Sequence, residues 1–104
     1  MLKGIILRNE IRSAKNLAPE EILLDDVCAV IVNENQRKIY LWSGKDANTS
    51  DKFKAARIAH LLNWKWFGGA AEVIQDNSKI KDILSKHARI DEEIPPAEIK
   101  LILG

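Results

Sequence analysis

The feature that most constrains the fold is an apolar run that is followed, after a short polar interval, by a second segment of strand character. Residues 27–32 read Val-Cys-Ala-Val-Ile-Val, and such a run is typical of a strand buried on both faces at the centre of a sheet. The polar residues 33–36 favour a turn. Residues 38–42, Lys-Ile-Tyr-Leu-Trp, resume strand character at once. Together these segments predict a β-hairpin.

A long helix is expected soon after the hairpin. The polar triplet Asn-Thr-Ser at 48–50 consists of residue types that cap helix N-termini. Neither glycine nor proline interrupts the residues from there to Asn63. The segment Trp-Lys-Trp-Phe at 64–67, which two glycines follow, is interpreted as lying beyond the helix. The helix is therefore predicted over about 49–63.

The remaining segments complete the pattern of an α+β domain. Besides the hairpin and the long helix, the expected elements are a strand over 2–8, a short helical turn opened by Pro19, a strand over 71–75 and a helix over about 78–88 capped by Asn77 or Ser78. Residues 91–104 are expected to form an extended tail, in which 99–103 could add an edge strand. We predict one domain over 1–104, with a mixed central β-sheet of about five strands flanked by one long and one shorter helix.

The charge balance, the hydrophobic pattern and the single cysteine argue against a nucleic-acid-binding protein, a membrane-spanning protein and a disulfide-bonded protein. Lys and Arg number 16 against 15 Asp and Glu, giving a net charge of +1. This balance lacks the strongly basic character of a nucleic-acid-binding surface. No apolar stretch approaches the roughly 20 residues of a membrane span. The single cysteine, Cys28, lies within the apolar run, which favours a buried thiol and a reducing, cytoplasmic setting.

The sequence offers no set of catalytic residues, so we expect no enzyme and no resident cofactor. Cys28 lacks the exposed position that a nucleophile needs. The two histidines, at 60 and 87, do not have the spacing of zinc ligands relative to each other or to the cysteine. Gly44-Lys45 and Gly68-Gly69 lack the full spacing of phosphate-binding loops.

Residues 28–62 carry a motif of moderate specificity. The hairpin reads Val-Ile-Val-Asn at 30–33 and then Ile-Tyr-Leu-Trp-Ser-Gly-Lys at 39–45, and the helix that follows reads Asp-Lys-Phe-Lys-Ala-Ala-Arg-Ile-Ala at 51–59. This combination resembles the gelsolin/villin/severin repeat, a family related in fold to ADF/cofilin. The resemblance covers about a third of the chain and implies a gelsolin-like fold.

A helical wheel at about 100° per residue separates two faces of the long helix. Ala55, Ile58, Ala59 and Leu62 fall within an arc about 100° wide, which should face the sheet. The opposite side carries Phe53, Arg57 and His60, with Ala56 and Leu61 on its flanks. The resemblance implies that this helix enters the cleft of actin, so these five residues are the predicted partner-binding set. The alternative to an exposed Phe53 is that its ring packs beneath the aromatic segment 64–67.

The sequence departs from the family that it resembles at the positions that would bind calcium. The resemblance implies a site made by a strand Asp, a helix Glu and backbone carbonyls. Cys28 and Asp51 stand at the two side-chain positions, and a thiol is a poor ligand for a hard cation. Asp26 could serve as the strand ligand only if the hairpin were about two residues longer than is usual in the family. We therefore expect calcium binding to be weak or absent.

The predicted function is binding of actin or an actin-like protein, by a module that is monomeric when free. Such a module would sequester monomers or cap filaments through the long helix. The alternative is a longin- or roadblock-type platform, which would bind small GTPases or dimerise. The turn Trp-Ser-Gly-Lys at 42–45 favours the first possibility, and the mass in sedimentation discriminates between a monomer and a symmetric dimer.

Overall fold

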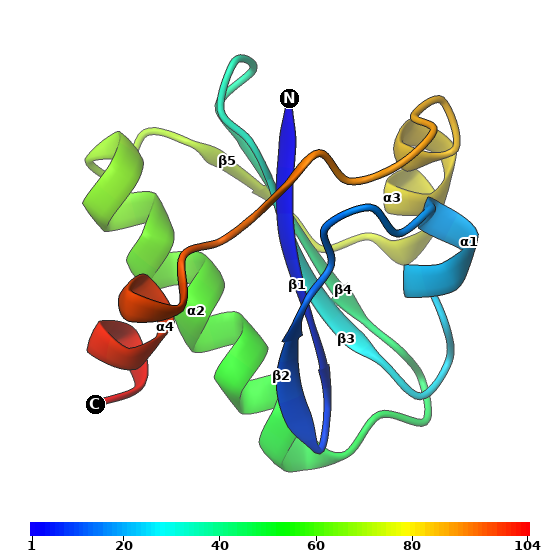
Figure 1. Ribbon diagram of the computed structural model, residues 1–104, viewed down its shortest axis with the longest axis horizontal. Coiled ribbons are helices and arrows are strands. Elements are labelled where there is room, and N and C mark those ends of the chain that lie inside the picture. Colours follow the sequence, from blue (N-terminus) through cyan, green and yellow to red (C-terminus); the bar gives the residue numbers. More distant parts are fainter.

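The chain folds into three layers, with a mixed sheet between two groups of helices (Figure 1). The computed structural model describes residues 1–104. In chain order the elements are β1 (Leu2–Arg8), β2 (Glu10–Ser13), α1 (Pro19–Ile22), β3 (Cys28–Asn33), β4 (Lys38–Ser43), α2 (Thr49–Phe67), β5 (Glu72–Ile74), α3 (Asn77–Leu84), β6 (Glu92–Glu93) and α4 (Pro96–Leu103). None of these helices is both long enough and apolar enough to span a bilayer.

The sheet has the order β2-β1-β3-β4-β5, and β6 pairs in parallel with β1. The expected hairpin is confirmed, because β3 and β4 pair antiparallel with Val30 opposite Leu41. β5 joins β4 in parallel, so the sheet is mixed, as the sequence predicted. It contains six strands, one more than the approximate number expected.

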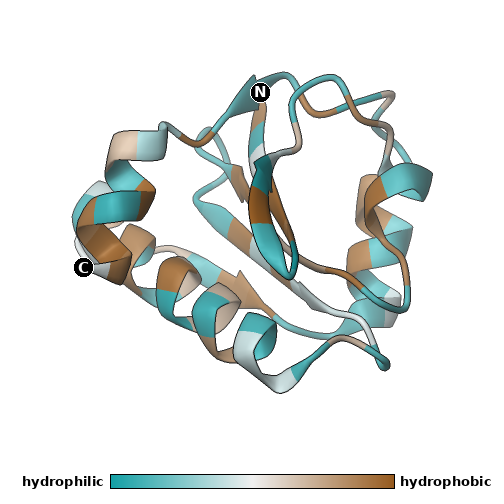
Figure 2. Cartoon of the chain, turned by 60° about the horizontal axis from the view of Figure 1, so that its bottom comes forward, coloured by the Kyte–Doolittle hydropathy of each residue, from teal (hydrophilic) through white to brown (hydrophobic).

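The central strand β3 is buried on both faces, which explains its unbroken apolar sequence. Cys28, Val30 and Val32 point to the side covered by α2 and α4. Ala29 and Ile31 point to the side covered by α1 and α3. Figure 2 shows helices on both sides of the sheet. The residues expected to face the core are confirmed as buried: Val30, Ile31 and Val32 of the apolar run and Ala55, Ile58, Ala59 and Leu62 of the long helix. Ile39 and Leu41 of β4 are buried as well.

The long helix extends four residues beyond its predicted end at Asn63. The Asn63 side chain donates from Nδ2 to the Ala71 carbonyl oxygen (3.1 Å) and accepts from the Ala71 backbone N–H at Oδ1 (2.9 Å). Asn63 therefore ties α2 to the chain that enters β5, and it does not end the helix. The helix ends at Phe67, and Gly68 caps it in a left-handed conformation with φ 59°.

The expectation of an extended tail over 91–104 is wrong, and so is the edge strand over 99–103. Only Glu92–Glu93 pair with β1, and residues 96–103 form the helix α4. Pro96 occupies the first turn, where a missing N–H costs nothing. Ile99 and Ile102, three residues apart, reach the core on the α2 side. The alternation of Ile99, Leu101 and Leu103 fits a strand equally well, which is why the sequence pattern was ambiguous.

The turn Trp-Ser-Gly-Lys at 42–45 fastens the end of β4 to the segment before β3. Trp42 is buried, and its indole N–H donates to the Leu24 carbonyl oxygen (2.9 Å). The Gly44 N–H donates to the Val27 carbonyl oxygen (2.9 Å). Glycine is needed at position 44 for space. A Cβ at this position would lie against the Asp25 carbonyl group and 2.6 Å from the Leu24 carbonyl oxygen.

Candidate functional site

The N-terminus of α2 is fixed to the turn between β1 and β2. Asn48 caps the helix, since its Oδ1 accepts from the Asp51 N–H (2.7 Å). The buried Asp51 carboxylate accepts from the Asn9 backbone N–H (2.9 Å) and from Asn48 Nδ2 (2.9 Å). Asn48 Nδ2 also donates to Asn9 Oδ1 (2.8 Å), so two hydrogen bonds join the first turn of α2 to the turn between β1 and β2.

The inner face of α2 is the stripe that the wheel predicted. Ala55, Ile58, Ala59 and Leu62 have no exposed surface. The two alanines lack bulk beyond Cβ, so the helix axis can approach the sheet closely. With this face buried, the opposite residues must point to solvent.

The outer face of α2 carries Phe53, Arg57 and His60, all of them exposed. Phe53 is 74% exposed, so the alternative that it packs beneath residues 64–67 is wrong. Ala56 is half-buried beside this face, and Leu61 is partly exposed at 37%. The structure therefore brings the predicted partner-binding residues together on one side of one helix.

Trp64 belongs to the same face and was missed by sequence reasoning. It follows Phe53 by 11 residues, which is close to three helical turns, and it is 69% exposed. Its omission follows directly from ending the helix at Asn63. The other two aromatic residues of the segment, Trp66 and Phe67, pack against the core instead.

The charges on α2 are almost all positive at its surface. Its only acidic residue is Asp51, which is buried at the cap. Lys54 and Arg57 are exposed and form no ion pair, whereas Lys65 pairs with Glu98 of α4 at 2.7 Å. The outer face thus combines large apolar side chains with unpaired cations.

A groove of about 370 Å³ lies beside this face, between α2 and α4. Leu61, Trp64 and Lys65 line it from α2, and Leu101 and Ile102 line it from α4. Leu101 is 71% exposed. The groove therefore continues the apolar surface of α2 onto the last helix.

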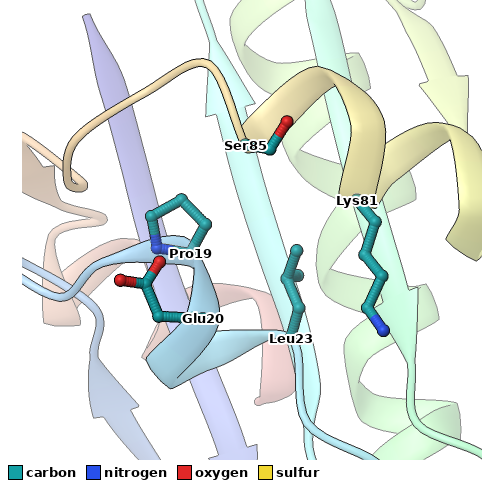
Figure 3. Close-up of a pocket in the computed structure, with 5 residues that line it drawn as sticks. All are labelled: Pro19, Glu20, Leu23, Lys81 and Ser85. Carbon is teal, nitrogen blue, oxygen red and sulfur yellow. The ribbon is translucent and has the colours of Figure 1, made fainter.

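A second hollow, of about 340 Å³, lies on the other side of the sheet between α1 and α3 (Figure 3). Pro19, Glu20 and Leu23 line it from the α1 side, and Lys81 and Ser85 line it from the α3 side. The Ser85 hydroxyl donates to the Asp82 carbonyl oxygen (2.7 Å). The Ser85 hydroxyl is thus bonded to the backbone of α3.

The calcium ligands considered from the sequence do not form a cluster. Asp26 is exposed and accepts from Arg8 Nη2 (3.1 Å), and Asp51 is engaged by Asn9 and Asn48 as described above. No three His, Cys, Asp or Glu side chains converge as they would around a metal ion. The arrangement fits Ca²⁺ poorly, because this ion takes six to eight oxygen ligands.

Cys28 is a buried structural thiol, as its sequence position indicated. Burial is the main reason why the pKa of Cys28 lies above its ordinary value of 9.0, and the negative charge of Asp51 raises this pKa further. A thiol that remains protonated and has no exposed surface is a poor nucleophile.

Comparisons with known proteins show a similarity at the level of the fold. No protein-family model and no curated protein matches this sequence. Among solved structures, the fold is similar to that of Thorarchaeota ProGel, a gelsolin-domain protein crystallised in complex with rabbit actin. The TM-score is 0.62 at 19% sequence identity, and the similarity covers 81% of this chain and 99% of ProGel. The layered mixed sheet and this similarity together show that the chain has a gelsolin-like fold.

Proposed function

We propose that this chain is a non-catalytic module that binds actin or an actin-like protein through the outer face of α2. The observation that carries the proposal is the row of exposed Phe53, Arg57, His60 and Trp64 on a helix whose other face is buried. The similarity to ProGel, whose structure was solved with actin, supports the choice of partner.

The residue types on this face suit a protein interface. Aromatic residues and arginine are enriched among the side chains that dominate binding energy. Full burial of the Phe53 ring would contribute about 1.5–3 kcal/mol. Arg57 would add less if it pairs at the rim of the interface, where solvent screens the charge. Phe53 and Trp64 are therefore the proposed anchors, and Ala56 and Leu61 would contact the partner beside them.

The proposed mode of action is sequestration of monomers or capping of filament ends, in the cytoplasm. One helix face provides one site, whereas severing a filament generally needs two linked sites that engage it together. The free protein is proposed to be monomeric. A longin- or roadblock-type platform is the alternative, and a tight symmetric dimer in sedimentation would favour it.

The test compares Phe53→Ala and Arg57→Glu with the wild type for inhibition of actin assembly. A matched control is Arg89→Glu, which makes the same charge change at an exposed residue next to Ile90 of the α1/α3 side of the core. We expect Phe53→Ala to weaken binding about ten- to a hundredfold, at about 1.4 kcal/mol per decade. Arg89→Glu should inhibit assembly as the wild type does. Undiminished inhibition by both α2 variants would reject this face.

A further inference from the structure

We infer that the partner-binding surface spans two helices, and that the groove between α2 and α4 receives an apolar side chain from an acidic segment of the partner. The inference rests on the proposed function, because it adds a second contact to the same partner. It assigns a binding role to α4, which the sequence pattern did not even place as a helix.

The distribution of exposed apolar side chains is the first argument. The large hydrophobic residues that remain exposed are Met1, Phe53, Leu61, Trp64 and Leu101. All except Met1 lie on α2 or α4, and three of them line the groove. Single exposed apolar residues need no explanation, but a contiguous group around a hollow marks an interaction site.

The rigid attachment of α4 is the second argument. Ile99 and Ile102 are buried in the core that α2 also covers. The ion pair between Lys65 and Glu98 joins the two helices at the surface. Leu101 is therefore held in position opposite α2 before any partner arrives, and a preorganised contact loses little entropy on binding.

The charge of the surface specifies the chemistry of the occupant. α2 and α4 together carry five Lys and Arg residues and two Asp and Glu residues, which is a net charge of +3, whereas the rest of the chain has a net charge of −2. Of the two acids, Asp51 is buried and Glu98 is paired with Lys65. Lys54, Arg57 and Lys100 are exposed and form no ion pair. Electrostatic complementarity therefore favours an acidic partner segment.

The same features argue against two other occupants. A second copy of the chain would pair this surface with itself about a two-fold axis and bring its unpaired cations together. An anionic membrane suits helices whose charged and apolar faces are separate. Here Arg57 and His60 lie between Phe53 and Trp64 on one face of α2. A shaped protein surface with apolar pockets and acidic side chains fits better.

The experiment measures the affinity for rabbit actin of the wild type, Leu101→Ala and Leu101→Glu, together with the melting temperature of each. The control Ala88→Glu introduces the same charge as Leu101→Glu at an exposed position outside α2 and α4. We expect Leu101→Ala to weaken binding about three- to tenfold and Leu101→Glu more than tenfold. All melting temperatures should stay near that of the wild type, and wild-type affinity should fall as salt concentration rises.

The outcomes separate this inference from the proposed function. If Leu101→Glu binds like the wild type while Phe53→Ala is impaired, the groove is not part of the surface and the function stands. If the wild type does not bind actin at all, both the proposed function and this inference are wrong. Two other results would also overturn the inference. In the first, the wild type is a dimer and Leu101→Glu dissociates it. In the second, the wild type binds phosphatidylserine vesicles, and Leu101→Glu abolishes this binding without changing the affinity for actin.

Discussion

Replacing Gly44 by alanine tests the packing of the turn that follows β4. An added Cβ would overlap the Asp25 carbonyl group and come within 2.6 Å of the Leu24 carbonyl oxygen. These are backbone atoms, so they cannot swing aside as the end of a flexible side chain can. The two segments would have to separate by about 1 Å to restore an ordinary contact.

The separation would strain two hydrogen bonds that join the segments. The Gly44 N–H donates to the Val27 carbonyl oxygen at 2.9 Å, and the Asp46 N–H donates to the Asp25 carbonyl oxygen at 2.8 Å. Each such bond contributes about 0.5–1.5 kcal/mol net, and overpacking alone costs about 1–3 kcal/mol. Gly44→Ala should therefore lower the free energy of unfolding by about 2–6 kcal/mol, or the melting temperature by about 10–30 °C for a chain of this length.

Thermal unfolding followed by circular dichroism measures this effect, and Gly68→Ala is the matched control. Gly68 has a positive φ of 59° but nothing within 4 Å of a Cβ. Its replacement should cost only the strain of a left-handed alanine, about 1–2 kcal/mol. A Gly44→Ala protein that melts like the wild type would refute the close approach of these segments.

Three further predictions concern the core, the pH dependence and calcium. Ala55→Leu should overpack the contact between α2 and the sheet and cost about 1–3 kcal/mol in chemical denaturation; an unchanged midpoint would contradict the orientation of α2. Burial raises the pKa values of Cys28 and Tyr40 above their ordinary values of 9.0 and 10.0, so the folded state keeps these protons to higher pH than the unfolded state. The free energy of unfolding should therefore fall as the pH rises above about 9, and a constant value in urea titrations up to about pH 11 would contradict this. Calorimetry should detect no micromolar calcium binding; such binding, if abolished by Asp51→Asn, would show that a strand ligand comes from elsewhere, with Asp26 the first candidate.

The sequence predicted the central hairpin and the orientation of the long helix because the apolar residues of these segments are stable only in the core. A run such as residues 27–32 has no polar side chain to face water, so it had to lie inside the sheet. Ile58 and Leu62, with Ala55 and Ala59 beside them, form the apolar stripe of α2 that faces the sheet. That assignment also turned Phe53, Arg57 and His60 outward, where the structure has them.

The features that sequence reasoning missed depend on contacts between distant segments. β2 is a short and mostly polar strand that exists because it pairs with β1. Asn63 looked like a helix end because its bonds to Ala71 cannot be seen locally. For the same reason Trp64 was left off the outer face, and α4 was read as a strand although Ile99 and Ile102 dock on the core.

The affinity of Phe53→Ala for actin decides whether the outer face of α2 binds actin. Phe53 is 74% exposed, so its removal should leave the melting temperature within about 2 °C of the wild type. This stable variant should bind actin about ten- to a hundredfold more weakly than the wild type does. Wild-type affinity in a correctly folded Phe53→Ala protein would contradict it.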